Sequence, residues 1–228
     1  DWGYNGISNN PNLTLEWLEK YPEKPWGWGS CGISRNPILT LEWLEKYPDK
    51  GWDWGGGGIS RNPNLTLEWL EKYPDKGWDW GEGGISYNPN LTLEWLEKHP
   101  NKGWCWGGYN GISRNPNLTL EILEKYPNKR WDWGYNGISN NPNLTLEILE
   151  KYYPNKDWDW RGISQNQNLT LEWLEKYPEC WCCEEGGGIS SNKLTSQKKL
   201  FIEKHEKAAL IIQKQWDICR YNPEYQIC

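Results

Sequence analysis

A unit of about 26 residues recurs along most of the chain, from its first residues to about residue 196. The pairs Ile-Ser and Leu-Thr mark every copy, and successive Leu-Thr threonines lie 25 to 27 residues apart. A unit this short cannot enclose a hydrophobic core alone, so each copy must bury its apolar side against its neighbours. We therefore expect about eight stacked repeats, the first one incomplete, rather than separate globular domains. The marker threonines are Thr14, Thr40, Thr66, Thr92, Thr119, Thr145, Thr170 and Thr195.

The second half of each repeat has the pattern of a short helix, as the copy around Thr66 shows. Thr66 suits the N-cap, because its hydroxyl can accept a hydrogen bond from a free amide of the first turn. Leu67, Leu70 and Tyr73 recur at helical spacing and predict one broad apolar face. Pro74 has no amide hydrogen and restricts the residue before it, so it ends the helix.

Two side-chain pairs support this helix. Trp69 and Tyr73 are four residues apart on the apolar side, and Glu68 and Lys72 have the same spacing, which predicts an ion pair within the helix. A helix of about eight or nine residues is marginal alone, so its stability must come from other repeats. Replacing Trp69 with alanine should therefore cost roughly 3–5 kcal/mol if the ring is buried.

The first half of the repeat is less regular. In the copy that begins at Trp78, three glycines between Trp80 and Ile85 weaken any helix, and Asn88-Pro89 is a turn signal. We expect a short, irregular first helix that runs from the Trp-x-Trp pair to Ile-Ser and ends at Asn-Pro. The segment between the second Trp and Ile varies in length, which places it at the surface.

Two architectures fit this period. One is an all-α, elongated solenoid of short helix-turn-helix repeats. The other is a leucine-rich-repeat-like α/β horseshoe, in which the column of Asn10, Asn36 and Asn62 could form an asparagine ladder. A strand would need alternating apolar residues, whereas residues 13–21 show helical spacing. The sequence therefore favours the all-α solenoid.

The repeat array occupies residues 1–196, and the sequence changes character in residues 197–228. Ala208, Ile212 and Trp216 can lie along one side of a helix. We expect this tail to form a C-terminal helix that caps the apolar end of the array. The chain begins inside a repeat and has no initiator methionine, which suggests a fragment of a longer protein.

Composition argues against two function classes. The net charge is −6, so the chain is a poor counter-ion for a phosphate backbone, and nucleic acid is not the expected partner. No apolar run approaches the roughly 18 residues that a membrane span needs. The chain has 20 Trp but one Phe and no Met, so tryptophan must supply much of the core volume.

Most repeats contain a Trp-x-Trp pair, and packing between repeats is its favoured role. Residues two apart do not share a helix face, so we expect the second Trp of each pair to be the more exposed. These second tryptophans form the candidate interaction surface, and they could also stack bases or sugars. They are Trp28, Trp54, Trp80, Trp106, Trp133 and Trp160.

The Asn-Leu-Thr segment also matches the acceptor sequence for N-glycosylation. A turn and a helix cap explain both polar residues without a glycan, and the second repeat carries Ile38 in the Asn position. We therefore expect a structural role. The asparagines concerned are Asn12, Asn64, Asn90, Asn117, Asn143 and Asn168.

The reactive side chains form no catalytic or metal-binding pattern. Residues 180–183 contain one Cys-x-x-Cys spacing, but no second pair and no nearby histidine, so scattered substitution is favoured over a zinc site or a local disulfide. Seven cysteines at unrelated repeat positions favour reduced thiols and an intracellular setting. His99 stands where other repeats have Tyr, so we expect it to pack. No cofactor, metal ion or catalytic residue is predicted.

Five segments carry a resemblance to a known family: residues 52–54, 59–66 and 70–74 of one repeat, and residues 208–216 and 221–228 of the tail. They resemble tandem Trp-rich repeats of uncharacterised proteins from giant, mimivirus-like DNA viruses. The Gly-rich expansion after the second Trp departs from that pattern. The resemblance implies a viral origin, a host-cytoplasmic or virion location and a repeat fold, and it supplies no activity.

Together these observations predict a non-enzymatic repeat scaffold that presents a protein-interaction surface. The expected partner is another protein; neither its identity nor the oligomeric state of the chain is predicted. The alternative is a ligand-binding module that stacks nucleobases or sugars on exposed Trp residues. The two functions differ in whether the tryptophan rings face solvent.

Overall fold

The computed structural model describes residues 2–3 and 6–177, and the chain divides into two compact units, residues 1–130 and residues 131–228, which we describe separately. The described residues form short α-helices and three-residue 3-10 turns (η), and no strand. The all-α repeat architecture is therefore confirmed, and the horseshoe with strands is excluded for these residues. The expected C-terminal cap lies outside the described residues.

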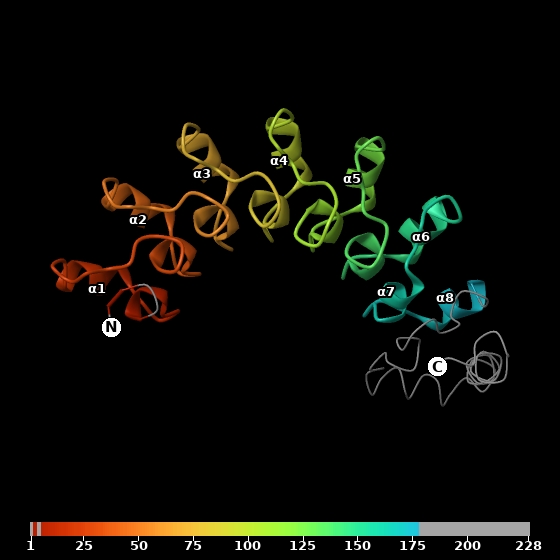
Figure 1. The fold of residues 1–228 in the computed structure, drawn as a ribbon, viewed down its shortest axis with the longest axis horizontal. Coiled ribbons are helices and arrows are strands. Elements are labelled where there is room, and N and C mark those ends of the chain that lie inside the picture. Colours follow the sequence, from red (N-terminus) through yellow and green to blue (C-terminus); the bar gives the residue numbers. More distant parts are fainter. Residues whose placement is uncertain (1, 4–5, 178–228) are drawn as a thin grey trace. The chain divides into compact units, whose positions relative to one another are not determined.

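In the first compact unit, η turns and α-helices alternate along the chain. Figure 1 shows that the α-helices lie along the convex edge of this unit and the η turns along its concave edge. The elements are η1 (Ile7–Asn9), α1 (Leu15–Lys20), η2 (Ile33–Arg35), α2 (Leu41–Lys46), η3 (Ile59–Arg61), α3 (Leu67–Lys72), η4 (Ile85–Tyr87), α4 (Leu93–Lys98), η5 (Ile112–Arg114) and α5 (Leu120–Lys125).

The described part of the second compact unit contains two further repeats. Where the linker after the second Trp is shortened to Arg161-Gly162, a five-residue α-helix replaces the η turn, and Asp159 Oδ1 caps it by accepting a hydrogen bond from Gly162 N at 2.6 Å. The elements are η6 (Ile138–Asn140), α6 (Leu146–Tyr152), α7 (Trp160–Ser164) and α8 (Leu171–Lys176).

The α-helices begin and end close to where the sequence predicts. Thr66 occupies the N-cap of α3 with extended backbone angles, but its hydroxyl accepts no hydrogen bond there. In α5, Thr119 Oγ1 accepts from Ile122 N at 3.3 Å, and in α6 Thr145 does the same for Ile148. The predicted hydroxyl cap is therefore present at α5 and α6 and absent at α3.

The predicted first helix is wrong in its extent. Trp52 and Trp54 lie in no regular secondary structure, and only the three residues from Ile59 are helical. Ile59 N donates to the carbonyl oxygen of Asp53 at 2.8 Å, which closes a glycine-rich loop instead of continuing a helix. Because a Cβ on Gly58 would lie 2.2 Å from that oxygen, this crossing requires glycine.

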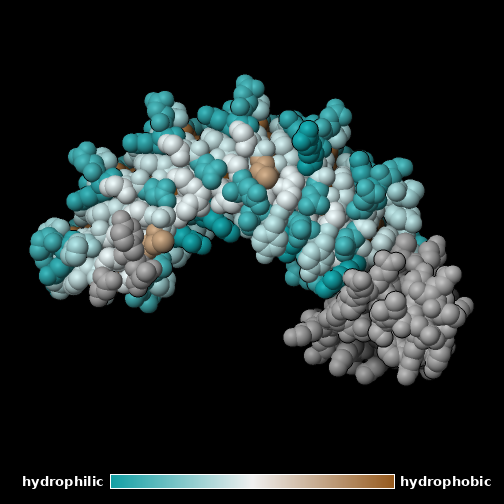
Figure 2. All heavy atoms as spheres, viewed as in Figure 1, coloured by the Kyte–Doolittle hydropathy of each residue, from teal (hydrophilic) through white to brown (hydrophobic). Residues whose placement is uncertain are grey.

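The core is a continuous apolar layer between the η turns and the α-helices. Ile59 and Leu65 are fully buried, and Trp69 and Leu70 from α3 complete the layer at 3% and 2% exposure. Polar side chains cover most of the surface seen in Figure 2. Within residues 6–177, no helix has the length and hydropathy needed to cross a bilayer.

Candidate interaction surface

The second Trp of each pair packs against the next repeat. Trp28 meets Trp52 edge-on, with ring centroids 5.0 Å apart and planes at 80°, and it contacts Tyr47 at 5.2 Å. Such aromatic pairs add to the stability gained by burying their area. Equivalent edge-on contacts join Trp54 to Trp78 and Trp80 to Trp104 in the first compact unit, and Trp133 to Trp158 in the second.

A lysine from the turn after the α-helix of the same repeat lies over five of the six candidate rings. Lys50 Nζ is 5.4 Å from the centroid of Trp28, a distance typical of a cation–π contact. The six candidate tryptophans are all half-buried. A base or sugar would have to displace this lysine to stack on the ring. The other pairs are Lys76 with Trp54, Lys102 with Trp80, Lys129 with Trp106 and Lys156 with Trp133, while Trp160 contacts Tyr177.

An asparagine ladder joins the repeats, although the array is helical. Asn62 Nδ2 donates to the carbonyl oxygens of Asn36 at 2.9 Å and Ser34 at 3.2 Å in the preceding repeat. Its Oδ1 accepts from Asn64 N at 2.9 Å, so the buried amide is satisfied on both sides. The ladder is thus not a signature of the horseshoe. Equivalent bonds to the preceding repeat come from Asn36, Asn88, Asn115 and Asn166.

The buried serine of each Ile-Ser pair provides a second link. Ser34 Oγ donates to the carbonyl oxygen of Trp28 and accepts from Asp53 N of the next repeat at 2.9 Å. The hydroxyl therefore fixes the Trp-x-Trp segments of two successive repeats relative to each other. Ser8, Ser60, Ser86 and Ser139 make equivalent bonds.

The α-helical edge carries a ladder of ion pairs between repeats. Lys72 pairs with Glu45 of α2, and not with Glu68 of its own helix, so the predicted ion pair within α3 is wrong. The helices are close enough for the lysine to reach the preceding helix. The ladder also contains Lys46 with Glu19, Lys98 with Glu71, Lys125 with Glu97 and, in the second compact unit, Lys176 with Glu150.

The asparagines of the Asn-Leu-Thr segments also form hydrogen bonds between repeats. Asn64 Nδ2 donates to the carbonyl oxygens of Leu39, at 3.1 Å, and Pro37 in the preceding repeat. Asn90 makes the corresponding bonds to Leu65 and Pro63. These contacts explain the recurrence of this residue by folding alone.

The described cysteines are isolated from one another. Cys31 is exposed and Cys105 is half-buried, and both are free thiols. Burial raises the pKa of the Cys105 thiol, which donates to the carbonyl oxygen of Gly107 at 3.0 Å. In residues 6–177, no group of three or more His, Cys, Asp or Glu side chains could hold a metal ion. The cluster at residues 180–183 lies outside the described residues.

His99 takes the packing position that tyrosine holds in other repeats. Its ring lies 4.9 Å from the ring of Trp80. Its Nε2 is buried without a hydrogen-bond partner, and burial, followed by the nearby Lys102, lowers the pKa of the imidazole. The residue therefore packs as a neutral ring.

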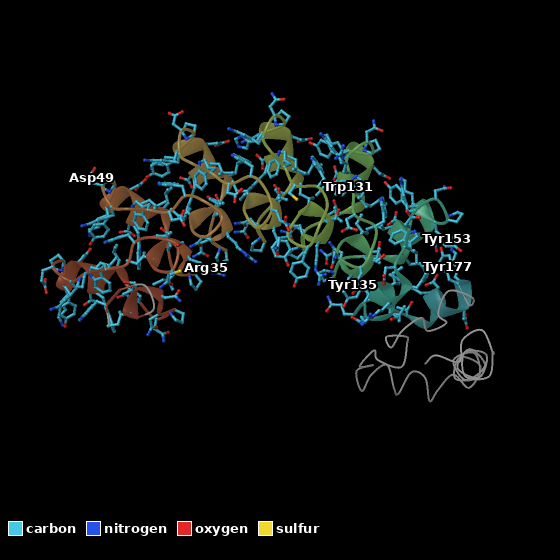
Figure 3. The ribbon with its side chains drawn as sticks, in the orientation of Figure 1. Arg35, Asp49, Trp131, Tyr135, Tyr153 and Tyr177 are labelled. Atoms are coloured by element: carbon cyan, nitrogen blue, oxygen red, sulfur yellow. The ribbon has the colours of Figure 1, made fainter. Side chains whose placement is uncertain are left out.

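The concave edge of the first compact unit carries side chains that the sequence analysis did not single out. We define the η edge as the third residue of each η turn in this unit, together with Glu82 and Tyr109 of the linkers. Tyr109 is 54% exposed, and Arg35 is exposed at the edge opposite Asp49 (Figure 3). The third residues are Asn9, Arg35, Arg61, Tyr87 and Arg114.

One signal in the sequence marks this edge. The Ile, Ser, Asn and Leu positions recur almost unchanged because each performs the same buried task in every repeat. The third η residue and the linker vary among the repeats, although arginine recurs in η2, η3 and η5. A position that is nearly invariant among the repeats therefore belongs to the contacts between repeats, whereas a variable position is not needed for stacking.

The comparisons with known proteins agree with this architecture. The model of the Sel1 repeat matches residues 1–20, 27–46, 51–72, 77–98 and 160–176. No curated protein and no solved structure matches the chain. The resemblance to viral Trp-rich repeats stays a prediction. The chain is thus similar to Sel1 repeats in five of its segments, and its described part is an all-α repeat array.

Proposed function

We propose that this chain is a non-enzymatic scaffold that binds a protein partner through the η edge of the first compact unit. One observation carries the proposal: the side chains that join repeats are nearly identical in every copy, whereas those on the η edge are Asn, Arg, Tyr or Glu and are exposed or half-buried. A stack needs only the first set. The second set is not needed for stacking and combines arginine in three η turns with Asn and Tyr in the other two, a pattern that can be specific for one partner.

The similarity to Sel1 repeats supports this role. Sel1 repeats serve as scaffolds for protein–protein interaction and are generally non-catalytic. Stacked repeats present a long edge on which a partner can make many contacts. The partner, its location and the viral setting are part of the proposal and rest on the sequence.

The η edge is a better contact surface than the tryptophan column. Trp54, for example, is held between Trp78 and Tyr73 and lies beneath Lys76, so a partner would meet the lysine first. Tyr109 is 54% exposed although Arg114 lies over its ring at 4.6 Å, whereas the candidate tryptophans are half-buried, and tyrosine is enriched in protein interfaces. We therefore assign the tryptophans to stacking and the η edge to recognition.

Site-specific photo-crosslinking tests the proposal. A photoreactive benzoylphenylalanine replaces Tyr109 on the η edge or, as a matched control, Glu68 on the exposed α-helical edge, and the protein is irradiated in the cells that produce it. We expect a discrete adduct from position 109 that is absent from position 68. An adduct from position 68 alone, or the same adducts from both, would contradict the η edge as the binding surface.

A further inference from the structure

The described arginines and lysines lie in different parts of the repeat. Arginines occur in the η turns and linkers, whereas the lysines belong to the α-helices and the turns that follow them. Arg130, after α5, is the one exception among the described arginines. The arginines of the first group are Arg35, Arg61, Arg114 and Arg161, and the lysines in α-helices of the first compact unit are Lys20, Lys46, Lys72, Lys98 and Lys125.

The two groups differ in their partners. The helical lysines from Lys46 onward are held in the ion-pair ladder with glutamates of the preceding helices. Arg61 instead lies over the ring of Tyr87, at 5.6 Å, and Arg114 over that of Tyr109, at 4.6 Å. Neither Arg35 nor Arg61 forms an ion pair with any residue in the described part of the chain.

The aspartates of the glycine-rich loops before η3 and η4 are hydrogen-bonded within those loops. Asp53 and Asp79 each accept a hydrogen bond from a loop amide, of Gly55 and Gly81 respectively, at 2.9 Å. Glu82 is the exposed carboxylate on this edge.

We propose that the η edge recognises an acidic, extended segment of a protein partner, with Arg35 and Arg61, on the adjacent turns η2 and η3, each taking a carboxylate. A guanidinium presents two parallel N–H groups that match a carboxylate, and a tyrosine beneath it limits the orientations that must be fixed on binding. This inference rests on the proposed function and adds the chemistry of its partner.

The test measures binding of a fluorescein-labelled peptide of alternating glutamate and glycine by fluorescence anisotropy. We expect saturable binding that weakens as sodium chloride is raised, and no binding of the peptide with glutamine in place of glutamate. The R35Q/R61Q variant should weaken Kd roughly tenfold or more, because it removes two charge-assisted contacts.

The K50Q/K76Q variant is the matched control, because it removes two positive charges from outside the η edge. We expect its Kd to stay within about twofold of the original protein, since distant exposed charges are largely screened. Circular dichroism verifies that both variants fold. R35K/R61K keeps the charge but loses the planar fork, and it should bind with intermediate affinity.

Three outcomes would overturn the acidic partner. They are failure of the glutamate peptide to bind, equal weakening by R35Q/R61Q and K50Q/K76Q, and tighter binding of a single-stranded oligouridylate of equal charge through the same arginines. The photo-crosslinking result is independent of these measurements. If position 109 still gives its adduct while the glutamate peptide fails, the scaffold function stands and the acidic partner does not.

Discussion

The side-chain amide of Asn62 donates to the backbone carbonyl of Asn36 at 2.9 Å, across the junction between two repeats. Both asparagines are fully buried. A helical solenoid therefore uses a ladder of side-chain amides along its length, in addition to packing of apolar faces, to fix each repeat against the one before.

Asn62→Ala tests the ladder. The change removes the bonds to Asn36 and Ser34 and leaves buried backbone oxygens without this donor, so we expect a loss of about 1–3 kcal/mol in the free energy of unfolding. Urea denaturation followed by circular dichroism measures it. Asn9→Ala is the control, since Asn9 is exposed and outside the ladder, and it should change stability by no more than about 0.5 kcal/mol. Equal effects of the two would show that the ladder contributes little.

Trp69 and Trp17 occupy the same helical position but differ in burial, at 3% and 43% exposure. Trp69→Ala should cost roughly 3–5 kcal/mol because it leaves a cavity between repeats. Trp17→Ala should cost clearly less, because the ring already faces water. Comparison of the two denaturation curves checks this, and a larger loss at Trp17 would contradict the burial seen in the first repeat.

Gly58 and Gly51 differ in the space that a Cβ atom would have, so their alanine variants test whether the loop crossing requires glycine. A Cβ on Gly58 would lie 2.2 Å from the Asp53 carbonyl oxygen, whereas a Cβ on Gly51 would meet nothing within 4 Å. We expect Gly58→Ala to lower stability by about 1–3 kcal/mol through overpacking. Gly51→Ala should change it by less than about 1 kcal/mol. Thermal denaturation of the two variants measures the difference, and equal melting temperatures would be inconsistent with the loop crossing.

His99 should make stability depend on pH near neutrality. Its pKa in the folded chain lies below the ordinary value of 6.5, chiefly because of burial, so the unfolded chain binds the proton more readily. The stability associated with neutral His99 is complete above pH 6.5 and is lost as the pH falls through the lowered pKa. His99→Tyr restores the residue of the other repeats and should remove this component.

The measurement is the difference in unfolding free energy between the original protein and His99→Tyr as a function of pH. That difference should widen in favour of the variant as the pH falls below 6.5. A difference independent of pH would show that the imidazole titrates equally in the folded and unfolded chains. Carboxylates that titrate in both proteins cancel in this comparison.

Periodicity predicted most of the fold, because the repeat displays its buried positions many times over. The α-helix around Trp69 and its end before Pro74 follow from local spacing. The first half did not follow, because the loop from Asp53 to Ile59 is closed by a backbone hydrogen bond that leaves no periodic trace in the sequence. Local spacing predicts an ion pair of Lys72 with Glu68, because spacing within one segment can indicate only contacts within one helix, whereas Lys72 pairs with Glu45 of the preceding helix.

The candidate site was less predictable than the fold. The recurrence of large aromatic residues predicts an interaction surface at Trp54 and its equivalents, but their rings pack between repeats. The η edge, with Arg61 and Tyr109, is marked only by variation among the copies, and its successive third η residues lie 26 or 27 residues apart in the sequence. They share one edge because the repeats stack in register, which becomes visible once the hydrogen bonds between repeats are known.

Residue-resolved amide hydrogen exchange tests the stacking directly. Asp53 N and Asp79 N donate to the buried hydroxyls of Ser34 and Ser60, both at 2.9 Å, across two successive junctions. We predict that both amides are protected in the original protein, and that Ser34→Ala accelerates exchange at Asp53 while Asp79 stays protected. Fast exchange of both amides in the original protein, or no effect of Ser34→Ala at Asp53, would contradict the account of how these repeats are joined.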